Sequence, residues 1–151
     1  ESVALLDCLA GTLETVGDRA AHKGVVLKVE VPEDAAVLAA GEDVERIFAN
    51  LLDNAVKYTP SGGKVDFEVK CEGGWLLAMV GDTGIGIKPE DQERIFEGFF
   101  RTEGARESGE IGTGMGLSNV KKLVERWGGE LTLESAFGEG SRFTMRLPAA
   151  G

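Results

Sequence analysis

The chain has 151 residues, enough for one domain with a substantial hydrophobic core. Its apolar and charged fractions, 42% and 28%, are those of a soluble globular protein. The formal net charge of −10 argues against a nucleic-acid-binding surface, because such surfaces need clustered Lys and Arg. An anionic small ligand remains compatible with this charge, since a few local cations and backbone amides suffice to bind one.

Cysteine and histidine usage points to a reduced, cytoplasmic protein. Cys8 and Cys71 are far apart and match no metal-binding spacing, and one histidine, His22, argues against a zinc site. Acidic residues interrupt the N-terminal stretch, and no apolar run approaches the ~20 residues needed to cross a bilayer. We therefore expect no signal peptide and no membrane contact in this piece. Because the chain begins without methionine, a parent protein could still carry a membrane anchor.

The first part of the chain predicts a helix and two strands. Apolar residues repeat at helical spacing over residues 3–21, and a glycine in 22–24 ends the helix. Alternation over residues 25–31 predicts a strand, and the short apolar run 35–40 predicts a second one. Residues 41–43 then provide a turn and an acidic start for the next helix.

That next helix, residues 43–59, carries a polar line beside its apolar stripe. Asn50, Asn54 and Lys57 recur at the three-and-four spacing of a helix face, so two amides and an ammonium are stacked in a line. Pro60 ends the helix. A line of this kind could bind phosphate and metal, or it could be an ordinary solvated face, and the helix alone leaves both readings open.

The middle of the chain predicts a strand hairpin. Val65, Phe67, Val69 and Cys71 alternate with polar residues and should share one face of a strand. Residues 72–74 form a hairpin turn, and the continuous apolar run 75–80 is typical of a central strand covered on both faces. A short helix is expected over residues 89–96, with its proline near the start.

The last third predicts a lid, a third helix and a final hairpin. Residues 97–113 show no convincing period, so we expect a functional lid or a disordered stretch that is mobile over 102–110. A glycine-rich segment, 112–117, leads into the helix, and residues 131–133 pair with 143–147 in the hairpin. The fold class is an α/β (α+β) two-layer sandwich, with a mixed, mostly antiparallel sheet, three helices on one face and a mobile lid.

Three further segments could carry chemistry. At the end of the apolar strand, residues 82–87 place the carboxylate of Asp82 beside glycines, where it could accept a hydrogen bond from an exocyclic amine; a tight turn capped by aspartate is the alternative. Residues 112–117 could expose helix N-terminal N–H groups to an anion, or their glycines could serve only the backbone turn at a loop–helix junction. Residues 96–101 hold three aromatics that could anchor the lid or form a local hydrophobic plug.

Together with residues 50–59, these segments resemble the four sequence boxes of the ATP-binding catalytic domain of sensor histidine kinases. This domain belongs to the superfamily that includes gyrase, the large heat-shock chaperone and the mismatch-repair ATPases. Residues 50–59 resemble the asparagine box, 82–87 and 112–117 the two glycine boxes, and 96–101 the phenylalanine box. Gly98 replaces the commoner proline of the phenylalanine box, a departure that would loosen the start of the lid.

The resemblance implies a site for ATP with magnesium in residues 24–151, preceded by a helical connector in residues 1–23. By similarity, Asp82 would accept a hydrogen bond from the adenine amine, and Asn54 would ligate magnesium. Asn50, Asn54 and Lys57 would take the catalytic roles. The implied nucleotide-binding residues are Asn54, Lys57, Tyr58, Asp82, Gly84, Gly86, Ile87, Phe99, Arg101, Gly112, Thr113, Gly114, Met115, Gly116 and Leu117.

Asn50 separates the chemistries found in this superfamily. Hydrolysing relatives carry a glutamate base at this position, one turn before the magnesium asparagine, whereas an amide cannot take a proton at neutral pH. The resemblance therefore favours phosphoryl transfer to histidine over simple ATP hydrolysis. The alternatives are an anti-sigma-factor-type serine kinase, which retains the glutamate, and a non-catalytic module that uses the fold only for binding.

The phosphate acceptor is expected outside this chain. His22 lacks the acidic neighbour and the Arg-Thr-Pro pattern of the family's acceptor helix, so we interpret it as structural or exposed. The implied partners are a histidine-containing dimerisation domain of the parent chain and a response-regulator receiver domain, with no nucleic acid. The chain should bind ATP without phosphorylating itself.

Overall fold

A computed structural model of the chain describes residues 2–92 and 116–150. Three α-helices are found there: α1 (Leu5–Lys23), α2 (Gly41–Lys57) and α4 (Gly116–Arg126), with one 3₁₀ turn, η1 (Pro89–Asp91). The strands are β1 (Ser2–Ala4), β2 (Val26–Glu30), β3 (Ala36–Leu38), β4 (Lys64–Glu72), β5 (Trp75–Asp82), β6 (Glu130–Ala136) and β7 (Gly140–Pro148).

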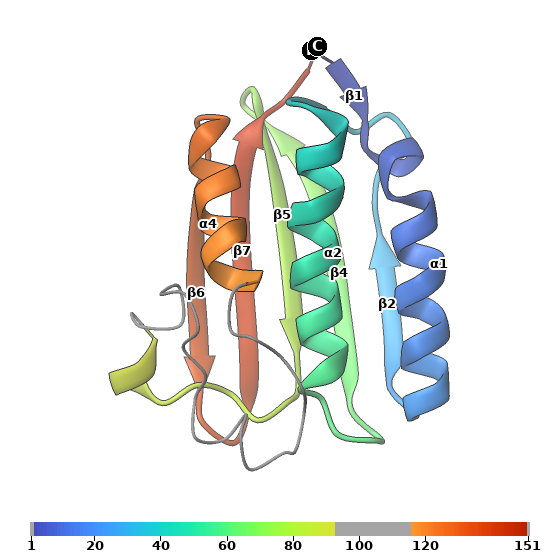
Figure 1. Cartoon of the computed structure of the whole chain (residues 1–151), viewed down its shortest axis with the longest axis vertical. Helices are drawn as coiled ribbons and strands as arrows, with labels where there is room; N and C mark the ends of the chain where they lie inside the picture. The colour runs from blue at the N-terminus through green and yellow to red at the C-terminus, as the bar shows by residue number, and fades with distance from the viewer. Residues whose placement is uncertain (1, 93–115, 151) are drawn as a thin grey trace.

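The fold is the predicted two-layer sandwich. Five strands form one mixed sheet in the order β2-β4-β5-β7-β6, in which β2 and β4 are parallel and all other neighbours are antiparallel. The three α-helices lie side by side on one face of this sheet (Figure 1). A separate pair, β1 and β3, joins the two ends of the chain, because Ala150 also donates its N–H to the carbonyl of Ala36 at 3.0 Å.

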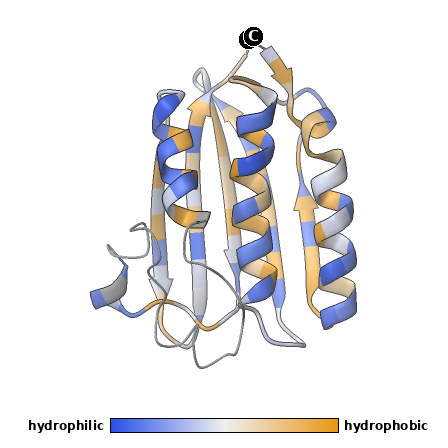
Figure 2. Cartoon of the chain, in the orientation of Figure 1, coloured by the Kyte–Doolittle hydropathy of each residue, from blue (hydrophilic) through white to orange (hydrophobic). Residues whose placement is uncertain are grey.

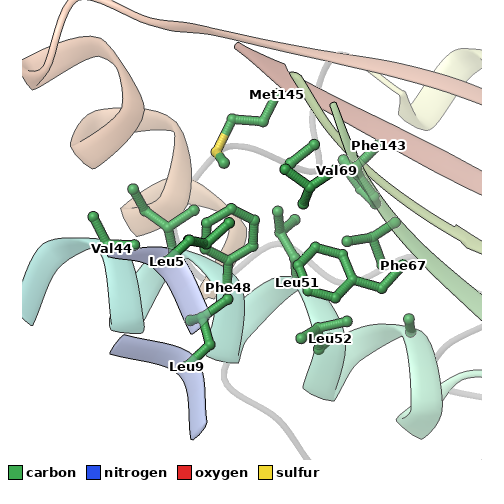
Figure 3. Close-up of a cluster of buried hydrophobic side chains, with 14 of the residues drawn as sticks. Leu5, Leu9, Val44, Phe48, Leu51, Leu52, Phe67, Val69, Phe143 and Met145 are labelled. Atoms are coloured by element: carbon green, nitrogen blue, oxygen red, sulfur yellow. The ribbon is translucent and has the colours of Figure 1, made fainter. Parts of the chain in front are cut away.

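The core lies between α2 and the sheet. The apolar stripe of α2 is buried, and Figure 2 shows hydrophobic and hydrophilic residues alternating along the helices as an amphipathic pattern requires. Phe48 of α2 packs on Phe67 of β4 with ring centroids 5.4 Å apart. Figure 3 shows Leu51 and Leu52 beside this pair, with Met145 on the facing strand. This packing fixes the rotation of α2 about its axis and thereby the direction in which its polar line points.

Several sequence predictions are corrected by the structure. β5 is central, as expected, but it is not covered on both faces: Leu76, Ala78 and Val80 are buried, whereas Trp75, Leu77 and Met79 are only partly so. The three α-helices all cover the face that carries Leu76, Ala78 and Val80. The continuous apolar run therefore belongs to a strand whose second face is only partly covered. Cys71 is exposed because it sits near the hairpin turn, beyond the core.

The boundaries at the start of the chain also differ. Residues 2–4 form β1 instead of helix, since the strand pairs with β3, and α1 continues through His22 to Lys23. Gly24 then ends α1 with φ +80°, a left-handed conformation that suits glycine. The helix expected over residues 89–96 is a 3₁₀ turn over Pro89–Asp91, and residues 93–96 lie outside the described part of the chain.

A buried carboxylate joins the far ends of α2 and α4. Asp43, in the first turn of α2, accepts a hydrogen bond from Nε1 of Trp127 at 2.8 Å and pairs with Arg126 at 3.4 Å. A carboxylate in the first turn also interacts favourably with the helix dipole. This contact fixes the spacing of the two helices at the end remote from the polar line of α2.

Trp127→Phe should lower the free energy of unfolding by about 1.5–3 kcal/mol, because the ring is kept while a hydrogen bond to a charged group is lost. Urea denaturation followed by circular dichroism measures the change. Trp75→Phe is the control: that ring lies under the guanidinium of Arg146 at 4.3 Å, and phenylalanine retains most of this contact. Equal losses in the two variants would show that the Asp43 contact contributes nothing specific.

Candidate functional site

Functional segments from distant parts of the sequence meet at one end of the sandwich. The last turn of α2, the end of β5, the start of α4 and the β6–β7 turn all lie at the end opposite the chain termini (Figure 1). Residues 83–88 continue from β5 across this end. Because the sheet and α2 are rigid elements, they hold the side chains of this end in fixed directions.

The polar line of α2 is placed as the sequence predicted. Asn50, Asn54 and Lys57 are all half-buried and lie next to the buried stripe. Within the described residues, the side-chain amides of Asn50 and Asn54 make no hydrogen bond. The ammonium of Lys57 lies 5.9 Å from the ring centre of Tyr58. The helix therefore presents amide oxygens, amide N–H groups and one cation that are available to a ligand.

Asp82, at the end of β5, adds a negatively charged hydrogen-bond acceptor to the amides and the cation of α2. One of its carboxylate oxygens, Oδ1, accepts the N–H of Gly84 at 2.9 Å, which orients the group. Burial raises the pKa of the Asp82 carboxyl above its usual value, and backbone N–H groups of Gly84 and Ser141 partly oppose this rise. The Asp82 side chain is half-buried and forms no ion pair with the described residues; a partly desolvated charge of this kind costs folding free energy, which is consistent with a ligand-binding role.

The turn after β5 is locked against the end of α2. A side chain at Gly84 would collide with the backbone carbonyl of Tyr58 and would lie 2.9 Å from Asp82 Oδ1. The same Tyr58 carbonyl accepts the N–H of Ile85 at 3.3 Å. The polar line of α2 and the Asp82 carboxylate are thereby held in a fixed relation, with one glycine as the point of closest approach.

The β6–β7 turn holds the other side of the same segment. Gly86, with φ +70°, packs so closely on the carbonyl of Ala136 that a side chain would overlap it. The carbonyl of Ile85 accepts the N–H of Gly138 at 2.7 Å, and the N–H of Ile87 donates to Oγ of Ser135 at 2.8 Å. Residues 84–87 are thus clamped from two sides.

Two serines beside Asp82 were not predicted from the sequence. Ser135 and Ser141 lie directly opposite each other on β6 and β7, and their hydroxyl oxygens are 2.8 Å apart. They continue the inward-facing rows of Leu133 and Phe143, where apolar residues are expected. A polar pair at two inward positions of a hairpin is the sequence signal that could have revealed them. Ser141 also lies opposite Asp82 on β5.

The remaining predicted site residues fall at or beyond the edge of the described chain. Gly116 begins α4, and Leu117 is partly buried against the core. The residues that lie outside the described part are Phe99, Arg101, Gly112, Thr113, Gly114 and Met115. The predictions for the lid and the phenylalanine box, residues 96–113, lie there as well.

A half-buried amide pair and an ammonium on a helix, with a partly buried carboxylate at the end of a central strand, place the candidate ligand-binding groups at one end of an α/β sandwich. Residues 39–151 match the model of the histidine kinase-, DNA gyrase B-, and HSP90-like ATPase family. The chain belongs to this family.

Its curated relatives are sensor histidine kinases. It is 35% identical over 148 residues to sensor histidine kinase RppB of Synechocystis sp., a match that covers 95% of the chain and 33% of RppB. It is 38% identical over 125 residues to sensor-like histidine kinase SenX3 of Mycobacterium tuberculosis, covering 83% of the chain and 30% of SenX3. The chain therefore spans about a third of the length of these relatives.

Solved structures agree with this assignment. The mycobacterial sensor histidine kinase MprB matches with a TM-score of 0.87 and 30% identity, over 99% of this chain and 98% of that one. The catalytic domain of histidine kinase ThkA matches at 0.83 and 25% identity, over 98% and 94%. Full-length ShkA, solved in complex with AMPPNP, matches at 0.81 and 30% identity, over 99% of this chain and 31% of ShkA. The chain is homologous to the catalytic ATPase domain of these kinases.

The described residues contain no helix of the length and hydrophobicity required for a membrane span.

Gly84→Ala should lower the free energy of unfolding by about 1–3 kcal/mol, because the new methyl group would overlap the Tyr58 carbonyl and must push the turn away. Gly81→Ala is the matched control. A methyl group at Gly81, three residues earlier on β5, would meet its nearest atom at an ordinary 3.8 Å, so stability should be unchanged or slightly raised. Denaturant titration of both variants compares them, and equal stability of the two would contradict the close approach.

Proposed function

We propose that the chain binds ATP with magnesium and transfers the γ-phosphoryl group to a histidine on a separate dimerisation and acceptor domain, as part of two-component signalling. The observation that supports this most directly is the desolvated Asp82 carboxylate, fixed by Gly84 and by the end of α2. In this position the carboxylate would accept a hydrogen bond from the exocyclic amine of adenine. Gly84, Gly86 and Ile87 would shape the pocket around the base.

The donor set of α2 fits a magnesium ion that is carried by the nucleotide. Asn54 has a half-buried amide that is unpartnered among the described residues, and a neutral oxygen ligand suits a cation whose charge is balanced mainly by phosphates. A magnesium ion bound here with the nucleotide would supply positive charge that offsets the charge of the phosphates. Asn54 would hold the metal, Asn50 would support the same site, and Lys57 would contact a phosphate.

The other nucleotide contacts extend from this pair of elements. Tyr58 would pack beside the base or sugar, and Leu117 and Gly116 at the start of α4 would lie near the phosphates. The proposed lid contacts are Phe99, Arg101, Gly112, Thr113, Gly114 and Met115. Closure of such a lid would exclude water, which matters because the γ-phosphoryl group must reach a histidine before it reaches water.

Asn50 supports kinase chemistry over hydrolysis. A general base for water must accept a proton, and an amide cannot do so near neutral pH. The reaction would then consist of positioning: the imidazole of the acceptor attacks the γ-phosphorus, the bond to the β–γ bridging oxygen breaks, and ADP leaves. No glutamate base stands at this position, which argues against the serine-kinase alternative.

The acceptor histidine would come from another part of the parent protein. His22 is exposed in the last turn of α1, within the segment that we interpret as a connector, residues 1–23. It has none of the acceptor-helix sequence around it. A response-regulator receiver domain would then take the phosphoryl group from the acceptor domain, and the parent protein could be anchored to a membrane while this domain lies in the cytoplasm.

Asp82→Asn should abolish ATP–magnesium binding measured by calorimetry, because the acceptor-only carboxylate is replaced by a group that also donates. Asp66→Asn, which changes a half-buried carboxylate on β4, should bind ATP like the wild type. Equal affinities for all three proteins would refute the adenine-pocket assignment.

The same variant should remain folded, which separates lost binding from lost structure. The folded-state pKa of Asp82 is raised, so its ionised form costs stability above that pKa and the cost vanishes as pH falls below the usual pKa of the unfolded state. Asp82→Asn should therefore match or exceed the wild type in free energy of unfolding at pH 7. That advantage should disappear in acid.

Incubated alone with radiolabelled ATP, the chain should incorporate no phosphate, since its only histidine lies outside any acceptor sequence. Addition of the acceptor domain of its own parent protein should yield label on that domain, stable to alkali and labile to acid as phosphohistidine is. The variant Asn54→Ala, with its proposed magnesium ligand removed, should label the acceptor domain far more slowly. Stable labelling of His22 would overturn the assignment of the acceptor to a separate domain.

A further inference from the structure

Lys23, the last residue of α1, contacts the helix that carries the proposed phosphate-binding groups. Its ammonium nitrogen donates to the backbone carbonyl of Val56 at 3.1 Å and to that of Lys57. Both carbonyls belong to the last turn of α2, where intrahelical N–H partners become few, and the carbonyl of Val56 also accepts the N–H of Thr59 at 3.3 Å. A side chain from one helix thereby caps the C-terminal end of another, immediately beside Lys57 and Tyr58.

The backbone of Lys23 is itself held in place. Gly24 follows in the left-handed conformation, and its carbonyl accepts the N–H of Gly62 at 2.8 Å. A side chain at Gly24 would come within 2.6 Å of the hydroxyl of Ser61, so the end of α1 packs tightly on the loop that leaves α2. Lys23 is half-buried there, and its ammonium reaches the carbonyls from a backbone position that is held in place.

The C-terminal end of a helix is an unfavourable place for an anion. Aligned peptide dipoles leave roughly half a negative charge at this end, and unpaired carbonyls carry it. The proposed function brings a triphosphate close to this end, because Asn54 and Lys57 lie in the last turn of α2. An ammonium bonded to the terminal carbonyls offsets that negative potential and also orients the peptide group from which the Lys57 side chain extends.

We propose that Lys23 is a positioning residue for the phosphate part of the nucleotide, acting through the C-terminal carbonyls of α2. This inference rests on the proposed function, since it presupposes that ATP binds at α2. It also extends the site beyond the four sequence boxes, into the helix interpreted as a connector. Lys23 would touch neither substrate nor metal, and would instead fix and neutralise the helix end that does.

A second contact between the same helices provides a contrast. Arg19 of α1 forms an ion pair with Asp53 of α2, one turn earlier, and the arginine side chain is 59% exposed. This pair joins side chains only and leaves the terminal carbonyls untouched. If Lys23 merely held α1 against α2, removal of the Arg19–Asp53 pair would have a similar effect on nucleotide binding.

The test compares ATP–magnesium with adenosine as probes, because adenosine keeps the base and sugar but lacks phosphates. Lys23→Met should weaken ATP–magnesium binding by roughly threefold to thirtyfold, the range of helix-end charge effects in partly buried sites. Adenosine affinity, measured by chemical-shift titration, should stay within about twofold, well inside the scatter of a neutral surface change. Lys23→Arg should restore most of the ATP affinity, since a guanidinium can donate to the same carbonyls.

Two variants serve as controls. Lys28→Met removes the same charge from an exposed position on β2, and the double variant Arg19→Met/Asp53→Asn removes the ion pair between α1 and α2 without changing net charge. Both should bind ATP–magnesium like the wild type. A wild type that fails to bind ATP–magnesium would refute the proposed function itself. If the wild type binds, unchanged ATP affinity in Lys23→Met, an equal loss for adenosine, or an equal loss in the double variant would each overturn the role of Lys23.

Discussion

The contact on which the site depends is the approach of Gly84 to the backbone carbonyl of Tyr58. The Tyr58 carbonyl ends α2, and the turn that contains Gly84 continues β5, so this contact joins the two rigid elements that carry the candidate ligand-binding groups. No side chain larger than hydrogen fits between them. The packing of helix against strand therefore completes the sandwich and also sets the separation between Asp82 and the amides of α2.

The site also conflicts with stability. A half-buried carboxylate at Asp82, and half-buried amides at Asn50 and Asn54 that have no partner among the described residues, are groups that a core optimised for folding would replace. The surrounding packing compensates for them, above all the buried stripe of α2 against β4 and β7 shown in Figure 3. This distribution, in which polar groups concentrate at one end of an otherwise apolar layer, is characteristic of binding sites. The chain's family membership accords with it.

Periodicity in the sequence predicted most of the architecture and the placement of the polar residues on α2. The three-and-four spacing of α2 correctly predicted both its buried stripe and the adjacent, half-buried line of Asn50, Asn54 and Lys57. Local patterns could not reveal that β2 pairs in parallel with β4, because that choice depends on the crossover between them. The open face of β5 was also misjudged, since partly covered Trp75, Leu77 and Met79 look the same in sequence as fully buried residues.

Side-chain contacts between different elements could not be predicted from the sequence either. Ser135, which accepts the N–H of Ile87, and Lys23, which donates to the end of α2, both act across the fold, and each looks unremarkable in its own segment. A lysine at the end of a helix is read as favourable to that helix's own dipole, and only the packing of α1 on α2 shows that its ammonium serves the neighbouring helix instead. Sequence reasoning works within one element at a time, so contacts of this type are hidden from it.

The sheet order has a consequence for how the domain assembles. The pairs β4–β5 and β6–β7 are hairpins closed by short turns, whereas β2 reaches β4 only after β3 and α2 have been laid down between them. Local hairpins close quickly, and a parallel edge pairing across a long crossover carries a larger loop-closure cost. We therefore expect α1 and β2 to be the last part of the domain to dock during folding and the first to detach in partial unfolding. The segment that caps α2 would then also be the most readily separable unit of the structure.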